Sequence, residues 1–157
     1  MRSALMWRAA HAPEGQILVE ADALRLMDGF WQNEHSKPES GGILLGYRRG
    51  PHLHVTMVTT PQRGDCGWRY FFKRSRRAHQ DIALRHWRAS GETVDYLGEW
   101  HTHPESSPTP SGEDYAEWAK ICARTSLPML FVIVGWSGQL WLGRSRGQQV
   151  PRCDLLL

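Results

Sequence analysis

The spacing of apolar residues divides the chain into strand-like runs and helix-like segments. A short strand is expected at 16–20. The following segment, 21–35, predicts a helix, because its large apolar residues recur at helical spacing and share one face. These residues are Leu24, Met27, Phe30 and Trp31.

Two pairs of β-rich runs are each joined by a short turn. The runs 41–47 and 52–60 are connected by Arg-Arg-Gly-Pro, which is typical of a hairpin. Near the other end of the chain, 129–136 and 139–142 flank a Ser-Gly dipeptide, which is also typical of a hairpin turn. We therefore expect largely antiparallel pairing.

The middle of the chain mixes both kinds of element. We expect strands at 70–72 and 94–101 and helices at 75–90 and 111–125, with a proline-rich loop before the last helix. Strands interspersed with three helices predict an α+β or mixed α/β fold, with a central sheet flanked by helices. The 157 residues are consistent with one domain covering 1–157.

Composition narrows the class of protein. The chain is 41% hydrophobic and 22% charged, which is typical of a globular protein and not of a disordered one. Its three widely spaced cysteines fit neither a disulfide framework nor a CxxC site. The N-terminal apolar patch is short and broken by Arg8, and no run approaches the length of a membrane span. We expect a cytoplasmic protein without membrane contact.

Charge suggests one alternative function. The net charge is +3, and the run Lys-Arg-Ser-Arg-Arg at 73–77 concentrates positive charge locally. A nucleic-acid-binding module is therefore a second hypothesis, although no helix-turn-helix, zinc-finger or RNP-type motif accompanies the run. A solvated helix face explains the same residues.

The segment GEWHTHPESSPTPSGED, residues 98–114, carries the candidate chemistry. His101 and His103 are two residues apart at the end of a predicted strand, so their imidazoles point to one face. Asp114 falls on the same helical stripe as Trp118 and Cys122, which predicts an inward-pointing carboxylate. A buried carboxylate needs a cationic partner, and no local Lys or Arg is placed to supply one.

Two imidazoles and one carboxylate form a hydrolytic zinc set with an open fourth position for water. Iron uses the same ligand types, so spacing and context must decide between the metals. Each part also has a structural explanation. His52-Leu53-His54 repeats the HxH pattern without a suitably spaced acid, and Ser111 with Asp114 is also the pattern of a helix capping box.

The whole pattern is more specific than its parts. His101-Thr102-His103-Pro104 followed by Ser111 and Asp114 resembles the JAMM signature of JAB1/MPN/Mov34 metalloproteases. The upstream segment 39–46, ESGGILLG, resembles the strand of that family that bears the catalytic glutamate. The resemblance covers most of the chain and implies a cytidine-deaminase-like MPN/JAB fold.

The resemblance also implies roles for individual residues. His101, His103 and Asp114 become ligands of Zn²⁺, Glu39 activates the attacking water, and Ser111 donates a hydrogen bond to the developing oxyanion. Glu99 competes with Glu39 for the role of general base, because it lies two residues before His101. The family places the base on the upstream strand, which favours Glu39 and leaves Glu99 a supporting role.

Within the family, the chain looks most like bacterial stand-alone JAB proteins, including those of CBASS antiphage operons. This implies an isopeptidase that cleaves after the C-terminus of a protein conjugated by a ubiquitin-like E1–E2 system, in CBASS a cGAS-like nucleotidyltransferase. Maturation of a ubiquitin-like sulfur carrier is the alternative with the same chemistry. A non-catalytic MPN scaffold is an alternative from another class.

Overall fold

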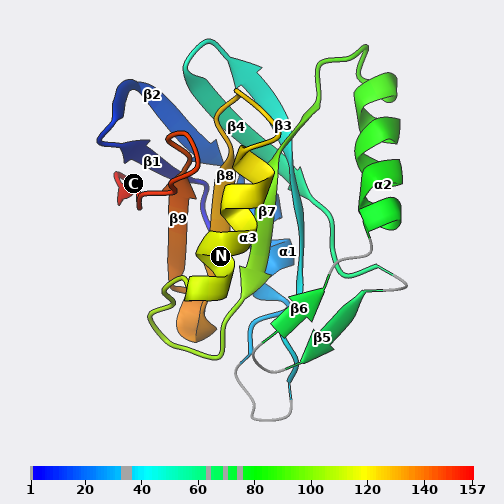
Figure 1. The fold of residues 1–157 in the computed structure, drawn as a ribbon, viewed down its shortest axis with the longest axis vertical. Helices are drawn as coiled ribbons and strands as arrows, with labels where there is room; N and C mark the ends of the chain where they lie inside the picture. Colours follow the sequence, from blue (N-terminus) through cyan, green and yellow to red (C-terminus); the bar gives the residue numbers. More distant parts are fainter. Residues whose placement is uncertain (1, 33–36, 63–64, 69–70, 74–75) are drawn as a thin grey trace.

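The computed structural model describes residues 2–32, 37–62, 65–68, 71–73 and 76–157. The larger of its two sheets has eight strands, and a separate two-stranded sheet lies beside it (Figure 1). The strands are β1 (Leu5–Ala9), β2 (Ala12–Val19), β3 (Gly41–Arg49), β4 (His52–Val58), β5 (Cys66–Trp68), β6 (Phe71–Lys73), β7 (Asp95–Thr102), β8 (Leu130–Val134), β9 (Leu140–Arg144) and β10 (Asp154–Leu155). The helices are α1 (Ala21–Asp28), α2 (Arg76–Ala89) and α3 (Gly112–Cys122), and a single 3₁₀ turn occupies Trp136–Gly138.

The large sheet has the strand order β10-β1-β2-β4-β3-β7-β8-β9. The pairs β2–β4 and β7–β8 are parallel, and the other pairs are antiparallel. The expected hairpins β3–β4 and β8–β9 both form. The predicted class, a largely antiparallel mixed sheet flanked by helices, is therefore confirmed.

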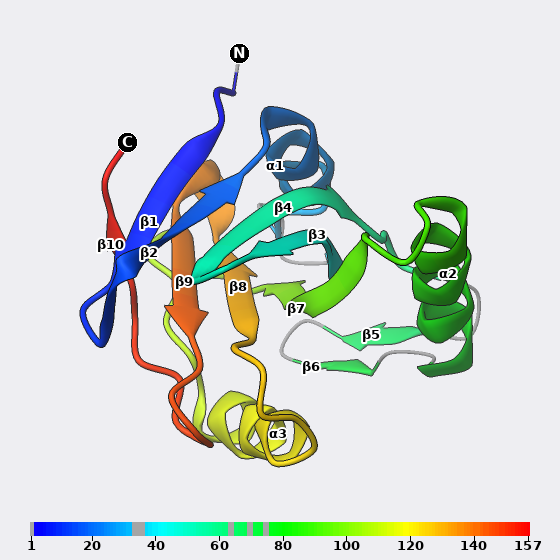
Figure 2. The same cartoon turned by 90° about the horizontal axis from the view of Figure 1, so that it is seen from above.

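Helices cover both faces of the sheet. The effect is clear in strand β8. All five of its residues are buried, as expected for a strand that is covered on both faces. Its residues 130, 132 and 134 join the core that includes α1, whereas Phe131 and Ile133 join the core beneath α3. Figure 2 shows α1 and α3 on opposite sides of the strands.

Two expectations about the elements need correction. The helix expected over 21–35 ends at Asp28, and Gly29 caps it, although Phe30 and Trp31 still pack against the core. Strands β1, β5 and β10 were not expected from the sequence. Of the basic run 73–77, residue 73 ends β6 and residues 76–77 begin α2, whereas residues 74–75 and the side chains of the run lie outside the described part of the chain.

One glycine is required where β7 approaches β8. Gly98 has φ +151°, and a Cβ there would lie 1.7 Å from the carbonyl oxygen of Leu130. The register between β3 and β7 shifts at the same level. Glycine therefore allows the close strand contact on which the position of the end of β7 depends.

Residues 152–155 run from one edge of the large sheet, at β9, to the opposite edge, at β1. Arg152 forms a bridge to Gly143 in β9, and β10 then pairs with β1 (Figure 2). Within the described residues, no helix is long and apolar enough to cross a membrane. Cys122 and Cys153 are free and buried, as expected for reduced thiols.

Candidate metal centre and active site

The two motif histidines lie at the end of β7 and face each other. His101 is in the strand, paired with Gly41 on one side and Ile133 on the other. His103 follows the strand, and its N–H donates to the carbonyl of Val134 at 3.0 Å. Both side chains are buried, and their Nε2 atoms are 3.0 Å apart. The expectation that both imidazoles share one face is confirmed.

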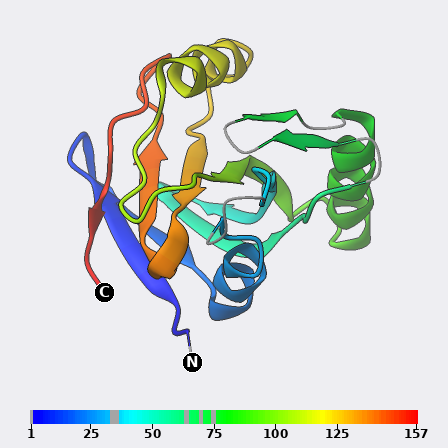
Figure 3. The same cartoon turned by 90° about the horizontal axis from the view of Figure 1, so that it is seen from below.

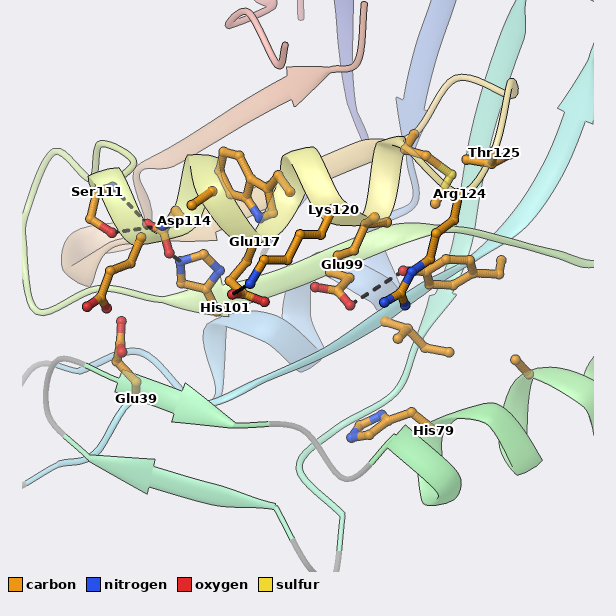
Figure 4. Close-up of a pocket in the computed structure, with 18 of the residues that line it drawn as sticks. Glu39, His79, Glu99, His101, Ser111, Asp114, Glu117, Lys120, Arg124 and Thr125 are labelled. Carbon is orange, nitrogen blue, oxygen red and sulfur yellow. Dashed lines mark hydrogen bonds and ion pairs between the residues drawn. The ribbon is translucent and has the colours of Figure 1, made fainter. Parts of the chain in front are cut away.

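Asp114 joins the histidines from the first turn of α3 (Figure 4). Its Oδ1 lies 3.2 Å from His101 Nε2, and its Oδ2 lies 3.1 Å from His103 Nε2. The same carboxylate accepts the N–H of Ser111 at 2.9 Å, while the Ser111 hydroxyl accepts the N–H of Asp114 at 3.1 Å. The capping box therefore forms and also aims the Asp114 carboxylate at the histidines.

Glu39 approaches from the segment just before β3. Its Oε1 lies 3.6 Å from His103 Nε2, and the side chain is only 5% exposed. Ser40 fixes this segment, because its N–H donates to Thr102 Oγ1 at 3.0 Å and its carbonyl accepts the N–H of Thr102 at 2.9 Å. Residues some sixty positions apart are thus brought together by the pairing of β3 with β7.

Two acidic residues, Glu39 and Asp114, are therefore candidates for the third metal ligand beside the histidine pair. Glu39 and the two histidines each offer an atom within 4.8 Å of the others. Asp114 is closer to both histidines, at 3.1 and 3.2 Å. These shorter distances favour Asp114 as the third ligand, because its one carboxylate reaches both imidazole rings.

The two carboxylates have opposite electrostatic environments. Burial, together with the negative charges of Asp114, Glu105 and Glu113, raises the pKa of Glu39 to about 8. Burial also acts to raise the pKa of Asp114, but hydrogen bonds to His101 and His103 outweigh it and hold that pKa well below its usual range. Asp114 is therefore the permanent anion, and Glu39 is the group that can take up and release a proton near neutral pH.

The donor set fits a divalent metal ion. In a tetrahedral zinc site, nitrogen and oxygen ligands at about 2.0–2.1 Å from the ion are about 3.3–3.4 Å from each other. The separations of 3.0–3.2 Å among the two Nε2 atoms and the Asp114 oxygens are close to this value. Lone pairs at this distance repel unless a proton or a cation lies between them.

Aromatic rings pack against the candidate metal site. The His101 ring centroid lies 6.1 Å from that of Trp118, which stacks on Phe131 at 4.8 Å and on Trp141 at 5.4 Å. All three supporting rings are buried. The packing of α3 against β8 and β9 therefore restrains the orientation of a candidate ligand.

The site opens into a groove of about 1290 Å³ that runs along β7. Glu99 lies on its floor, where it accepts a hydrogen bond from the Tyr96 hydroxyl at 3.4 Å. Figure 4 places Glu39 near Asp114 and His101, and Glu99 further along the strand beside Arg124. The geometry thus favours Glu39 over Glu99 as the group beside the histidines.

Two features of the site were missed by the sequence analysis. Glu105 Oε1 lies 3.8 Å from His103 Nδ1, a buried nitrogen without a hydrogen-bond partner. Its position directly after the HxHP motif was a usable signal, because metal-binding histidines commonly orient through a neighbouring acid. His79, which lines the groove from α2, gave no signal, because it sits in a basic helix that resembles a solvated one.

Comparisons with known proteins agree with this geometry. The profile of a family described as prokaryotic homologs of the JAB domain matches residues 30–144. A CD-NTase/cGAS isopeptidase from Pseudomonas aeruginosa is 46% identical over 106 residues, which cover 66% of this chain and 67% of that protein. A CD-NTase/cGAS isopeptidase from Vibrio cholerae is 39% identical over 134 residues, 85% of each chain. A probable metalloprotease from Sinorhizobium fredii is 30% identical over 116 residues, covering 68% of this chain and 71% of that protein.

A solved structure supports the fold. The solution structure of a protein from Desulfitobacterium hafniense superposes with a TM-score of 0.62 at 19% identity, covering 85% of this chain and 87% of that one. The predicted JAB-type fold and the resemblance to bacterial JAB proteins are both confirmed. The chain belongs to the prokaryotic homologues of the JAB domain and is a hydrolytic metalloprotease of that family.

Proposed function

We propose that this chain is a zinc-dependent isopeptidase that releases a cGAS-like nucleotidyltransferase from a protein to which its C-terminal carboxyl has been conjugated. The observation that carries the proposal is the convergence of His101, His103 and Asp114, with Glu39 beside them. The relatives named CD-NTase/cGAS isopeptidase support the substrate class. We also infer that residues 1–157 act as one JAMM/MPN metallopeptidase domain, since one sheet extends from β1 to β10.

In this proposal His101, His103 and Asp114 hold the metal. Zinc at this position would lower the pKa of water and polarise the scissile carbonyl. The low pKa of Asp114 keeps its carboxylate charged, so it can complete the donor set with two neutral imidazoles. Glu105, near His103 Nδ1, would orient the second ring.

Glu39 acts as the proton shuttle. Its carboxylate accepts a proton from the water whose oxygen attacks the carbonyl carbon, and it then delivers that proton to the lysine ε-amine as the carbon–nitrogen bond breaks. The products are a free C-terminal carboxylate and a free amine. The raised pKa of Glu39 suits both halves of this cycle near neutral pH.

Ser111 stabilises the oxyanion. Its oxygen accepts the N–H of Asp114, which leaves the hydroxyl hydrogen available for donation. A donor aimed at the charge that develops in the transition state accelerates acyl transfer. The structural capping role and the catalytic role of Ser111 are therefore compatible.

The test compares two substrates with zinc-loaded protein. One is a cGAS-like nucleotidyltransferase joined through its C-terminus to a lysine of a carrier protein, and the other is a sulfur-carrier precursor with a short C-terminal extension. We expect kcat/KM to be higher for the conjugate, with activity lost in a chelator and restored by zinc. Preferential cleavage of the sulfur-carrier precursor would refute the proposed substrate, and full activity in metal-free protein would refute the mechanism.

A further inference from the structure

Three buried polar side chains form a hydrogen-bonded chain outside the metal centre. On α2, His79 Nδ1 lies 2.7 Å from Thr59 Oγ1, and His79 Nε2 lies 2.7 Å from Asp65 Oδ2. Thr59 is 4% exposed and His79 2%, and the Asp65 side chain is 2% exposed. Buried polar groups at such short distances form a specific attachment, because breaking it would leave them without partners.

The partners define how the protons are arranged. A carboxylate only accepts, so the Nε2–H of His79 donates to Asp65, whose Oδ2 also accepts the N–H of Gln62 at 2.6 Å. The other ring nitrogen, Nδ1, is hydrogen-bonded to the Thr59 hydroxyl. The oxygen of that hydroxyl in turn accepts the N–H of Ile43 at 2.9 Å. Both ring nitrogens of His79 are satisfied in this arrangement.

The attachment is the most deeply buried contact of α2 that the structure describes. Among the described side chains of α2, only His79 is buried. Ile82 and Ala83 are partly buried, and Leu84 and Trp87 are 43% and 37% exposed. Helices of globular proteins are usually held by an apolar face. In the described part of α2, the hydrogen bonds of His79 add a buried polar attachment to apolar contacts that are only partly buried.

Helix α2 also forms a wall of the groove that contains the metal centre. His79, Gln80 and Ala83 line this groove together with Glu39 and the motif histidines. Figures 2 and 3 show α2 and α3 apart from each other. Thr59 bonds directly to Ile43 on the groove floor. The chain of hydrogen bonds therefore ties the wall of the groove to its floor.

We propose that His79 is a positioning residue that holds α2 in place as a wall of the substrate groove, with Asp65 and Thr59 fixing its ring. The inference rests on the proposed function and adds to it that the tail of the conjugated protein occupies this groove. His79 does not take part in proton transfer at the metal. Loosening its attachment should therefore weaken substrate binding more than it slows the chemical step.

The experiment uses the full-length, zinc-loaded protein and a matched pair of variants. Asp65→Ala removes the acceptor of His79 Nε2, whereas Asp65→Asn keeps an acceptor oxygen. Leu84→Ala, on the exposed face of the same helix, is the control. Amide hydrogen exchange over residues 78–89 reports the attachment directly, and KM and kcat on the nucleotidyltransferase conjugate report the groove.

For Asp65→Ala we expect exchange in α2 to become at least about tenfold faster, with β7 and β8 unchanged, and KM to rise about tenfold at nearly constant kcat. Asp65→Asn should recover much of both effects, and Leu84→Ala should match the wild type. If Asp65→Ala unfolds globally, Thr59→Val gives the same two measurements from the other side of the ring.

Two outcomes would overturn the inference. Unchanged exchange in α2 would show that His79 does not anchor the helix, and faster exchange with unchanged KM would remove α2 from the substrate groove. Hydrogen exchange needs no substrate. A protein that fails to cleave the conjugate would therefore count against the proposed function while leaving the anchoring role of His79 open to measurement.

Discussion

Replacing Glu39 by glutamine should stabilise the metal-free protein while abolishing most of its activity. The carboxyl group is buried beside Asp114 and has a pKa of about 8 in the folded protein, against 4.5 in an unfolded chain. Between these two values the folded state keeps a proton that the unfolded chain has released. Its stability must therefore fall as pH rises through this window. The neutral amide of Glu39→Gln carries no such penalty.

The magnitude follows from the size of the pKa shift. Each pH unit in the window contributes about 1.4 kcal/mol, so the penalty grows from pH 5 upward and is on the order of 3 kcal/mol at pH 7. Asp114 behaves oppositely, because its lowered pKa adds stability that is lost only when pH falls below the usual range for aspartate. That loss lies outside the window in which Glu39 acts.

The assay is urea denaturation in the presence of a chelator, from pH 5 to pH 8, with both proteins measured side by side. The difference in unfolding free energy should favour Glu39→Gln and should increase with pH. All other side chains are the same in both proteins, so their contributions largely cancel in the difference. A pH-independent difference, or a wild type that gains stability relative to the variant, would refute the assignment of a raised pKa to Glu39.

Activity provides the second half of this prediction. With zinc restored, Glu39→Gln should keep its metal content and lose about 10²–10⁴-fold in turnover, the usual contribution of general acid–base catalysis. Glu99→Gln is the control and should lose less, because Glu99 lies further along the groove. If Glu99→Gln were inactive while Glu39→Gln remained normally active, Glu99 would be the proton shuttle and Glu39 the supporting residue.

Four further substitutions test the site and the residues that support it. Asp114→Ala should lower zinc affinity in a competition titration, whereas Ser111→Ala should keep zinc and lose rate; equal zinc loss in both would contradict this division of roles. Trp118→Ala should destabilise the fold by about 3–5 kcal/mol in urea denaturation, because it removes a buried stack of aromatic rings; a loss below about 1 kcal/mol would show that the stack contributes little. Gly98→Ala should lower Tm and zinc content together, since its Cβ would clash with the Leu130 carbonyl; normal values would show that β7 adapts.

The sequence identified the candidate site well because its residues carry local signals. The HxHP motif at the end of a strand and the capping pattern at the start of a helix both describe short stretches of chain, and each formed where it was expected. Glu39 was harder, because nothing local joins it to His101. Only the resemblance to a family supplied that link, and the pairing of β3 with β7 gives its physical basis.

Elements that depend on distant partners were not predictable in the same way. The two residues of β10 are too few to show any periodicity, and they form a strand only because β1 accepts them. The helix expected over 21–35 was too long, because the helical spacing of apolar residues continues past Asp28. Phe30 and Trp31 still pack against the core after the helix has ended. The buried state of His79 depends on Thr59 and Asp65, which no pattern within α2 reveals.

The closure of the large sheet by its last residues has a consequence for an enzyme that handles extended polypeptides. Residues 151–153 cover the outer side of β9, and β10 occupies the outer side of β1 with only two residues. Exposed strand edges invite unwanted pairing with other chains, and short or covered edges prevent it. In the proposed function, a protein tail that enters the groove would meet a sheet whose outer hydrogen-bonding groups are largely taken, which should keep the enzyme from pairing with its own substrates or with other copies of itself.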